Sequence, residues 1–119
     1  MGQKKYPFHR ELAATASAGT NELKTFVVVP GRLLCVQRVG VENETSTYTD
    51  LRILIDDFGE EFLLAEEDSP QAATLYWMTD TVYLRESQRL VARLTGCTAS
   101  HVLRAYITGW WQQSGEVRP

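Results

Sequence analysis

The sequence is poor in the residues that build metal centres and disulfide frameworks. It contains two cysteines, Cys35 and Cys97, and two histidines, His9 and His101, and no pair of them has CxxC or HxxxH spacing. A zinc site needs about four such ligands in a close pattern, so we expect no metal centre. Both cysteines stand among apolar residues, in "RLLCVQRV" and "LTGCTAS", and are expected to be buried free thiols.

Motifs that mark common catalytic and cofactor sites are missing too. The chain has no Walker A loop, no GxGxxG and no GxSxG elbow. We therefore expect no enzymatic activity and no cofactor. It also contains no long apolar run and no stretch typical of a secretory signal peptide. This predicts a protein that neither spans a membrane nor is secreted through a signal peptide.

A surplus of basic residues is absent as well. Twelve Lys and Arg residues stand against fifteen Asp and Glu residues, which gives a net charge of −3. Small DNA-binding domains usually carry a clear basic surplus, because contacts to phosphates supply much of their affinity. The charge balance therefore weighs against nucleic acid as a partner.

What the chain does contain, from Leu23 onward, is a series of short segments that favour β-strands. The stretch "LKTFVVVPGRLLCVQRVGVEN" is rich in β-branched residues on both sides of Pro30-Gly31. "LRILID" alternates, and "EFLLAE" follows after a turn that contains Gly59, which predicts a hairpin. Short strands separated by frequent turn residues are typical of a sandwich or barrel.

Residues 88–107, "QRLVARLTGCTASHVLRAYI", fit two different structures. The first is a helix-turn-helix, with Ala92, Gly96 and Val102 at the positions where that motif wants a small residue, a glycine and an apolar anchor. Its second helix would read bases, and arginines would contact phosphates. The DNA-binding candidates under this alternative α+β fold are Arg89, Arg93, Ser100, His101 and Arg104.

The second structure, a pair of strands, accounts for more residues. Leu90, Ala92 and Leu94 would share one face of the first strand, and Leu103, Ala105 and Ile107 one face of the second. Arginines fall on the other faces, as a sheet with one solvated side requires. We therefore predict an all-β protein, a single antiparallel β-sandwich of the jelly-roll type. Residues 1–22 would form an N-terminal arm, 23–113 the sandwich and 114–119 a polar tail.

The two longest strand-like stretches carry a resemblance to a known group of proteins. "VVVPGRLLCVQRV" and "VYLRESQRLVARLTGCTASHVLRAYITGWW" are similar to runs in small β-sandwich proteins of tailed-phage virions, namely head-decoration and tail-associated proteins. The resemblance spans about Thr25 to Trp111. It implies a virion structural protein that forms a homo-oligomer, such as a trimer or other ring, and contacts capsid or tail proteins. It also implies a location in the virion or the host cytoplasm.

Candidate interface residues follow from charge and from paired aromatics. Four arginines lie between 85 and 104, after a block of seven carboxylates between Asp56 and Asp68 for which we favour a solvated surface over a cation site. Opposite charges of this kind could meet across subunits of an oligomer. In Tyr76-Trp77 and Trp110-Trp111, one ring of each pair should face outward, as a subunit contact or as a sugar-binding surface. The candidate interface residues are Tyr76, Trp77, Trp110, Trp111, Arg85, Arg89, Arg93 and Arg104, and the four aromatics are also the candidate sites of a carbohydrate-binding sandwich.

Overall fold

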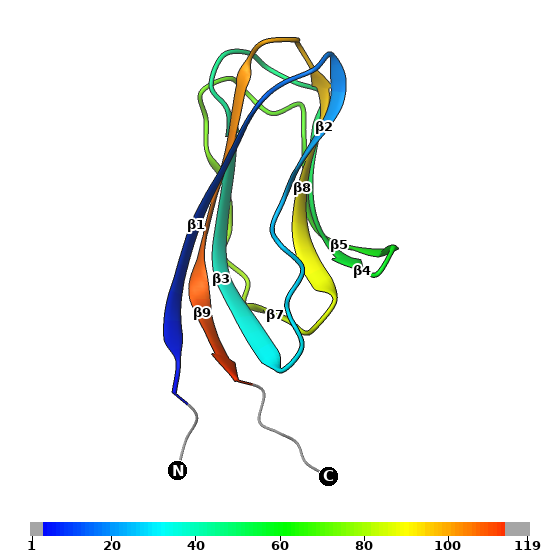
Figure 1. Ribbon diagram of the computed structural model, residues 1–119. Coiled ribbons are helices and arrows are strands. Elements are labelled where there is room, and N and C mark those ends of the chain that lie inside the picture. The colour runs from blue at the N-terminus through cyan, green and yellow to red at the C-terminus, as the bar shows by residue number, and fades with distance from the viewer. Residues whose placement is uncertain (1–3, 114–119) are drawn as a thin grey trace.

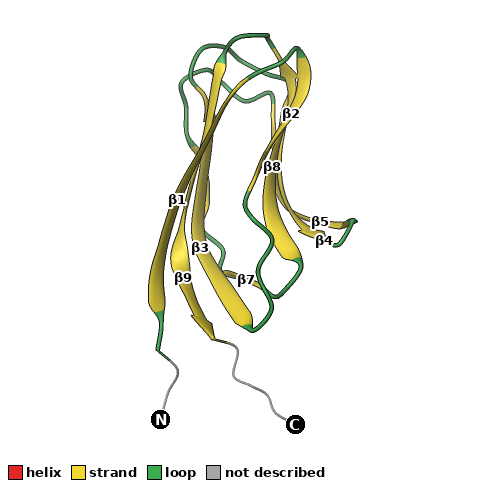
Figure 2. Cartoon of the chain, in the orientation of Figure 1, coloured by secondary structure: helices red, strands yellow, loops and turns green. Residues whose placement is uncertain are grey.

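The computed structural model describes residues 4–113. Over that range its regular secondary structure consists of β-strands joined by loops and turns, without a helix (Figure 2). No helix long and apolar enough to cross a membrane is found among the described residues. The strands are β1 (Tyr6–Thr15), β2 (Gly19–Lys24), β3 (Arg32–Asn43), β4 (Asp50–Asp57), β5 (Glu60–Asp68), β6 (Tyr76–Met78), β7 (Val82–Leu84), β8 (Gln88–Cys97) and β9 (Val102–Gln113).

The strands form two facing antiparallel sheets. The first, sheet A, has the order β1-β9-β3-β6, with β7 also paired to β3, and the second, sheet B, has the order β2-β8-β4-β5. In Figure 1 the two sheets are seen almost edge-on, with β1, β9 and β3 on one side and β2, β8 and β4 on the other. The protein is therefore an all-β sandwich, which confirms the predicted jelly-roll-type fold class.

The core lies between the sheets and is built by the alternation seen in the sequence. Leu103, Ala105 and Ile107 of β9 are at most 2% exposed, and Leu90, Ala92 and Leu94 of β8 are at most 3% exposed. Each of these side chains stands two residues from the next, so one face of each strand packs into the core while the other meets solvent. Cys35 and Cys97 are both buried free thiols, on β3 and β8 respectively.

The helix-turn-helix alternative for residues 88–107 is wrong. These residues form β8 and most of β9, with a turn between Cys97 and Val102. The two strands belong to different sheets, because β8 pairs with β2 and β4 whereas β9 pairs with β1 and β3. The physical reason is the period of the apolar residues. A spacing of two buries them all on a strand, whereas on a helix it would scatter them around the axis.

The N-terminal arm predicted for residues 1–22 is replaced by two strands. Strand β1 pairs with β9 from Tyr6 opposite Trp111 to Thr15 opposite Val102, and β2 pairs with β8. Strand β1 is an edge strand whose inward positions, including Phe8 and Leu12, are only half buried. The alternation of apolar and polar residues is consequently weak in the sequence of β1. The predicted tail, 114–119, lies outside the described residues.

The predicted β4–β5 hairpin is present and ends in a tight turn. Phe58 and Gly59 both have positive φ angles, 54° and 96°, which is the geometry of a two-residue type I′ turn. The carboxylate Oδ1 of Asp56 accepts a hydrogen bond of 2.8 Å from the backbone N–H of Gly59. This bond fixes the turn and holds the Phe58 side chain outside the sandwich, where it is 87% exposed.

Candidate functional site

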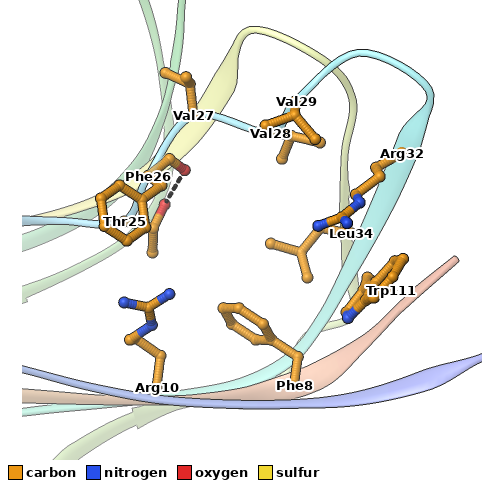
Figure 3. Close-up of a pocket in the computed structure, with 10 residues that line it drawn as sticks. All are labelled: Phe8, Arg10, Thr25, Phe26, Val27, Val28, Val29, Arg32, Leu34 and Trp111. Carbon is orange, nitrogen blue, oxygen red and sulfur yellow. Dashed lines mark hydrogen bonds between the residues drawn. The ribbon is translucent and has the colours of Figure 1, made fainter. Parts of the chain in front are cut away.

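An apolar groove opens between the two sheets at the edge formed by β1. It has a volume of about 350 Å³. Figure 3 shows Phe8 and Arg10 of β1 on one side, the segment 25–29 opposite them, and Arg32, Leu34 and Trp111 at one end. We call this space the β1 groove; it is lined by Phe8, Arg10, Thr25, Phe26, Val27, Val28, Val29, Arg32, Leu34 and Trp111.

The segment 25–29 forms the second wall of the groove because it continues along β8 after β2 has ended. The backbone N–H of Thr25 donates to the carbonyl of Leu90 at 3.0 Å, and the N–H of Val28 donates to the carbonyl of Gln88 at 2.8 Å. Val28 is buried, whereas Phe26 is 72% exposed. Hydrogen bonds to β8 thus hold the segment 25–29 in place, while the Phe26 ring stays exposed to solvent. Large exposed rings of this kind are unusual without a partner.

Two arginines border the β1 groove, and each guanidinium lies over an aromatic face. The Arg10 guanidinium is 4.9 Å from the centroid of the Phe26 ring, and that of Arg32 is 4.0 Å from the centroid of Trp111. Trp111 also stacks on Tyr6, with 4.4 Å between ring centroids. No carboxylate among residues 4–113 forms an ion pair with Arg10 or Arg32. The groove therefore combines an apolar lining with positive charge.

The outer face of sheet A carries a second group of aromatic side chains. Trp77 is 47% exposed and lies flat over Gly40, where an added Cβ would be 2.6 Å from its ring. The Arg38 guanidinium lies 4.6 Å from the centroid of the same ring. On β7, Tyr83 is 55% exposed and meets Trp110 edge to face, with 6.3 Å between centroids. These rings form an exposed aromatic surface.

The predicted aromatic pairs do place one ring outward and one inward. Trp77 and Trp110 stand on the outer face of sheet A, with Trp110 beneath the Lys5 ammonium at 4.3 Å. Tyr76 and Trp111 face the core, where both pack against the buried cluster. The Tyr76 hydroxyl accepts a hydrogen bond of 2.7 Å from the backbone N–H of Gln71. The outer face of sheet A therefore presents Trp77 and Trp110, whereas Trp111 borders the β1 groove.

Three of the four predicted interface arginines form ion pairs within the chain. Arg93 lies between Glu22 and Glu61, at 2.6 Å and 2.5 Å, and Arg89 lies 3.6 Å from Asp56. Arg104 pairs with Glu11 at 2.6 Å and with Glu44. Arg85 is exposed in the loop before β8, and no carboxylate of residues 4–113 pairs with it. The acidic and basic stretches, well separated in the sequence, are neighbours in the fold.

One ion pair on sheet B changes the pKa of its carboxylate. The Arg93 guanidinium, through its hydrogen bonds, holds the pKa of Glu61 below its usual range. Asp50, Glu66 and Asp68 place one carboxylate oxygen each within 4.8 Å of one another. Arg52 forms ion pairs with two of them, at 3.3 Å from Asp50 and 3.2 Å from Glu66, so its guanidinium supplies positive charge to this cluster.

The remaining residues of the DNA-reading hypothesis lie in the turn between β8 and β9. Ser100 has a φ of 74°, and its N–H donates to the carbonyl of Ala16. His101 Nδ1 lies 3.0 Å from Ser46 Oγ. Both side chains thus stand in a loop at one end of the sandwich, and no helix presents them to a base pair.

Sequence reasoning missed the β1 groove and the exposed Phe58. The groove needs residues 8–10, 25–34 and 111 to come together, which no local pattern reveals. A signal was present in "FVVV", where four consecutive apolar residues break the alternation expected of a half-buried strand. Phe58 was visible as an apolar residue inside an acidic turn, a position where a polar residue is the norm.

Comparison with known proteins supports the fold class. No protein-family model and no curated protein matches the sequence. The whole chain superposes on part of a chain in the structure of infectious bursal disease virus, Gx strain, with a TM-score of 0.54 and 11% identity. This chain spans 35% of that one. At the level of fold, the protein therefore resembles a β-sandwich from a virus.

Two further structures match more distantly. One is an exo-β-1,3-galactanase from Phanerochaete chrysosporium, with a TM-score of 0.39 and 12% identity over 90% of this chain and 29% of the enzyme. The other is a mutant of the family 29 carbohydrate-binding module CBM29-2, with a TM-score of 0.38 and 14% identity over 99% of this chain and 89% of the module. Sandwiches of this kind serve many functions, so these two matches do not bear on what this chain does.

Proposed function

We propose that the protein is a non-catalytic structural subunit of a virion, a head-decoration or tail-associated protein that works through oligomeric contacts. The observation that carries the proposal is the number of large apolar side chains exposed on so small a domain. Large apolar side chains rarely gather on the surface of a soluble monomer unless a partner covers them. Those exposed are Tyr6, Phe26, Val27, Val29, Phe58, Phe62, Leu63, Trp77 and Tyr83.

The state of the reactive side chains supports the non-catalytic part of the proposal. Burial raises the pKa of the Cys35 and Cys97 thiols, which makes both weak nucleophiles at neutral pH. Arg93 and Arg104 are held in ion pairs within the chain. None of these four side chains lines the β1 groove, so they do not converge there on a bound molecule.

A likeness in fold supports the virion setting, and the phage-type assignment rests on the pattern of two sequence runs. The fold is similar to that of a chain from infectious bursal disease virus. The sequence runs at 27–39 and 82–111 are similar to those of tailed-phage sandwich proteins. A subunit present in many copies gains avidity from weak contacts, so modest apolar patches are sufficient for stable attachment.

Sedimentation velocity of the purified protein over a wide concentration range tests the proposal. We expect a discrete oligomer whose fraction rises with concentration, and closed rings or regular rows in electron micrographs. A single monomeric species at every concentration would refute self-association, and turnover of a substrate with an intact fold would refute the non-catalytic part.

A carbohydrate-binding module is the second candidate, and the flat exposure of Trp77 favours it. A pyranose ring stacks on an aromatic face of this kind, and Arg38, whose guanidinium lies over the Trp77 ring, offers donors for hydroxyl groups. Titration with a glycan panel, followed by tryptophan fluorescence, separates the candidates. Binding that disappears in Trp77→Ala and persists in Phe58→Ser would establish a sugar site, and no response to any glycan would leave the structural subunit as the better proposal.

A further inference from the structure

We propose that the turn of the β4–β5 hairpin in one copy docks into the β1 groove of a second copy. In this contact, which rests on the proposed oligomeric function, Phe58 enters the apolar groove. Asp57 and Glu60, on either side of the turn, meet Arg10 and Arg32. We call residues 57–60 the β4–β5 tip.

The size and lining of the β1 groove suit an aromatic side chain. A cavity of about 150 Å³ is enough to accept a benzene ring in other proteins, and the groove measures about 350 Å³. Phe8, Phe26 and Trp111 offer ring faces and edges, and Val28 and Leu34 supply the buried floor. Aromatic rings in such surroundings gain from edge-to-face packing in addition to burial.

The charges at the groove are available to a partner. Arg52, Arg89, Arg93 and Arg104 each lie against a carboxylate of their own chain. Among residues 4–113, the guanidinium groups of Arg10, Arg32 and Arg38 lie against aromatic rings and against no carboxylate, and the first two of these border the groove. An occupant with an apolar centre and negative flanks would therefore complement the groove in both respects.

The β4–β5 tip has that composition. Phe58 is the most exposed of the large apolar side chains described. Asp57 and Glu60 are exposed as well, and within the described part of the chain neither forms an ion pair. The type I′ turn and the hydrogen bond from Gly59 to Asp56 hold the tip in one conformation. A prepared conformation reduces the entropy lost on binding.

The tip and the groove are different surfaces of the molecule, so the contact joins two copies. Phe58 does not line the groove of its own chain. The tip ends the β4–β5 pair, which projects away from the sandwich in Figure 1, whereas the groove lies at the β1 edge. Contacts between unlike surfaces generate rings when the rotation closes and open rows when it does not.

Charge and apolar variants on the two sides test this contact. Phe58→Ser removes the aromatic ring of the tip, and Arg32→Glu reverses a charge at the groove. Phe62→Ser is the matched control, because its exposed ring belongs to the same hairpin but lies outside residues 57–60 and so outside the proposed contact. All three positions are exposed, so we expect each variant to fold, and circular dichroism is the measurement that checks this. Sedimentation equilibrium then gives the association constant of each protein.

We expect Phe58→Ser to weaken association about thirtyfold, the usual effect of losing a central aromatic contact. Arg32→Glu should weaken it in a salt-dependent manner, and Phe62→Ser should leave it within about threefold of wild type. The decisive step is to mix Phe58→Ser, which keeps its groove, with Arg32→Glu, which keeps its tip. One complementary contact remains, so the mixture should form one-to-one dimers.

The outcomes distinguish this contact from the broader proposal. If wild type forms oligomers that Phe58→Ser and Arg32→Glu leave intact, the tip-to-groove contact is refuted while the oligomeric subunit stands. If wild type is monomeric at every concentration, both are refuted. Two deficient variants that do not associate when mixed would also overturn the contact, because it requires only one good tip and one good groove.

Discussion

Replacing Gly109 by alanine tests the close approach of the two central strands of sheet A. Gly109 stands in β9 opposite Val36, beside the irregular pairing between Val36 and Arg38 in β3. An alanine Cβ would lie 1.9 Å from the carbonyl oxygen of Cys35, whereas real contacts of this kind essentially never fall below 3.0 Å. The obstructing atom belongs to the backbone, so a side-chain rotation cannot relieve the clash.

The structure gives the size of the effect. The strands must separate locally by about 1.1 Å, which lengthens a typical 2.9 Å backbone hydrogen bond to about 4.0 Å, beyond its useful range. Loss of about two such bonds costs about 1 kcal/mol each, and overpacking adds about 1–3 kcal/mol. The expected loss is therefore about 3–5 kcal/mol, out of a total stability of about 5–15 kcal/mol for a domain of ordinary size.

Guanidinium unfolding followed by tryptophan fluorescence measures this loss. Gly19→Ala is a suitable control, because nothing lies within 4 Å of an added Cβ there and only the positive φ of 98° is unfavourable. We expect that control to cost about 1–2 kcal/mol, clearly less than Gly109→Ala. A free energy of unfolding for Gly109→Ala within about 0.5 kcal/mol of wild type would refute the close approach of β3 to β9.

Three further measurements follow from the core, the thiols and the ion pairs. Leu103→Ala should lower the free energy of unfolding by about 2–5 kcal/mol, because its fully buried side chain leaves a cavity; a loss below about 1 kcal/mol in denaturant unfolding would contradict that placement. Cys35 and Cys97 should react with a thiol reagent far more slowly in the native than in the unfolded protein, and rapid native modification would show that either is accessible. The depressed pKa of Glu61 means that its pairing with Arg93 contributes fully above pH of about 4.3 and is lost as the pH falls through the lower, folded-state value. Wild type should accordingly lose more stability than Arg93→Met on acidification below that pH, and parallel pH profiles would contradict the pairing.

The sandwich could be predicted where each strand has one dry face and one wet face. From Leu90 to Leu94 in β8 and from Leu103 to Ile107 in β9, every second residue is apolar and buried, so the period of two was evident in the sequence. Strand β1 was not predicted, because its inward positions include Arg10, whose guanidinium lies in the groove instead of in solvent. A charged residue at an inward position hides the alternation that identifies a strand.

The surfaces were harder to predict than the strands, since they depend on register. The expectation that acidic and basic stretches meet across subunits ignored how β4, β5 and β8 align. Their pairing sets Asp56 opposite both Arg89 and Glu61, and this alone brings opposite charges together within one chain. That one ring of each aromatic pair faces outward did follow from the sequence, because neighbouring residues on a strand face opposite ways, but only the structure identifies Trp77 and Trp110 as the outward rings.

The order of strands in sheet A has a consequence for how the protein is made. Strand β9, the last of the described strands in chain order, lies between β1 and β3, and Tyr6 at one end of the described chain pairs with Trp111 near the other. Until β9 has left the ribosome, β3 therefore pairs only with β6 and β7, and β1 has no partner strand in sheet A. Such distant pairings are slow to form, because the entropy of closing a long loop is lost before any contact compensates. The newly made chain consequently waits with one edge of β1 and one edge of β3 unpaired, and unpaired strand edges are prone to pair with other chains until β9 arrives.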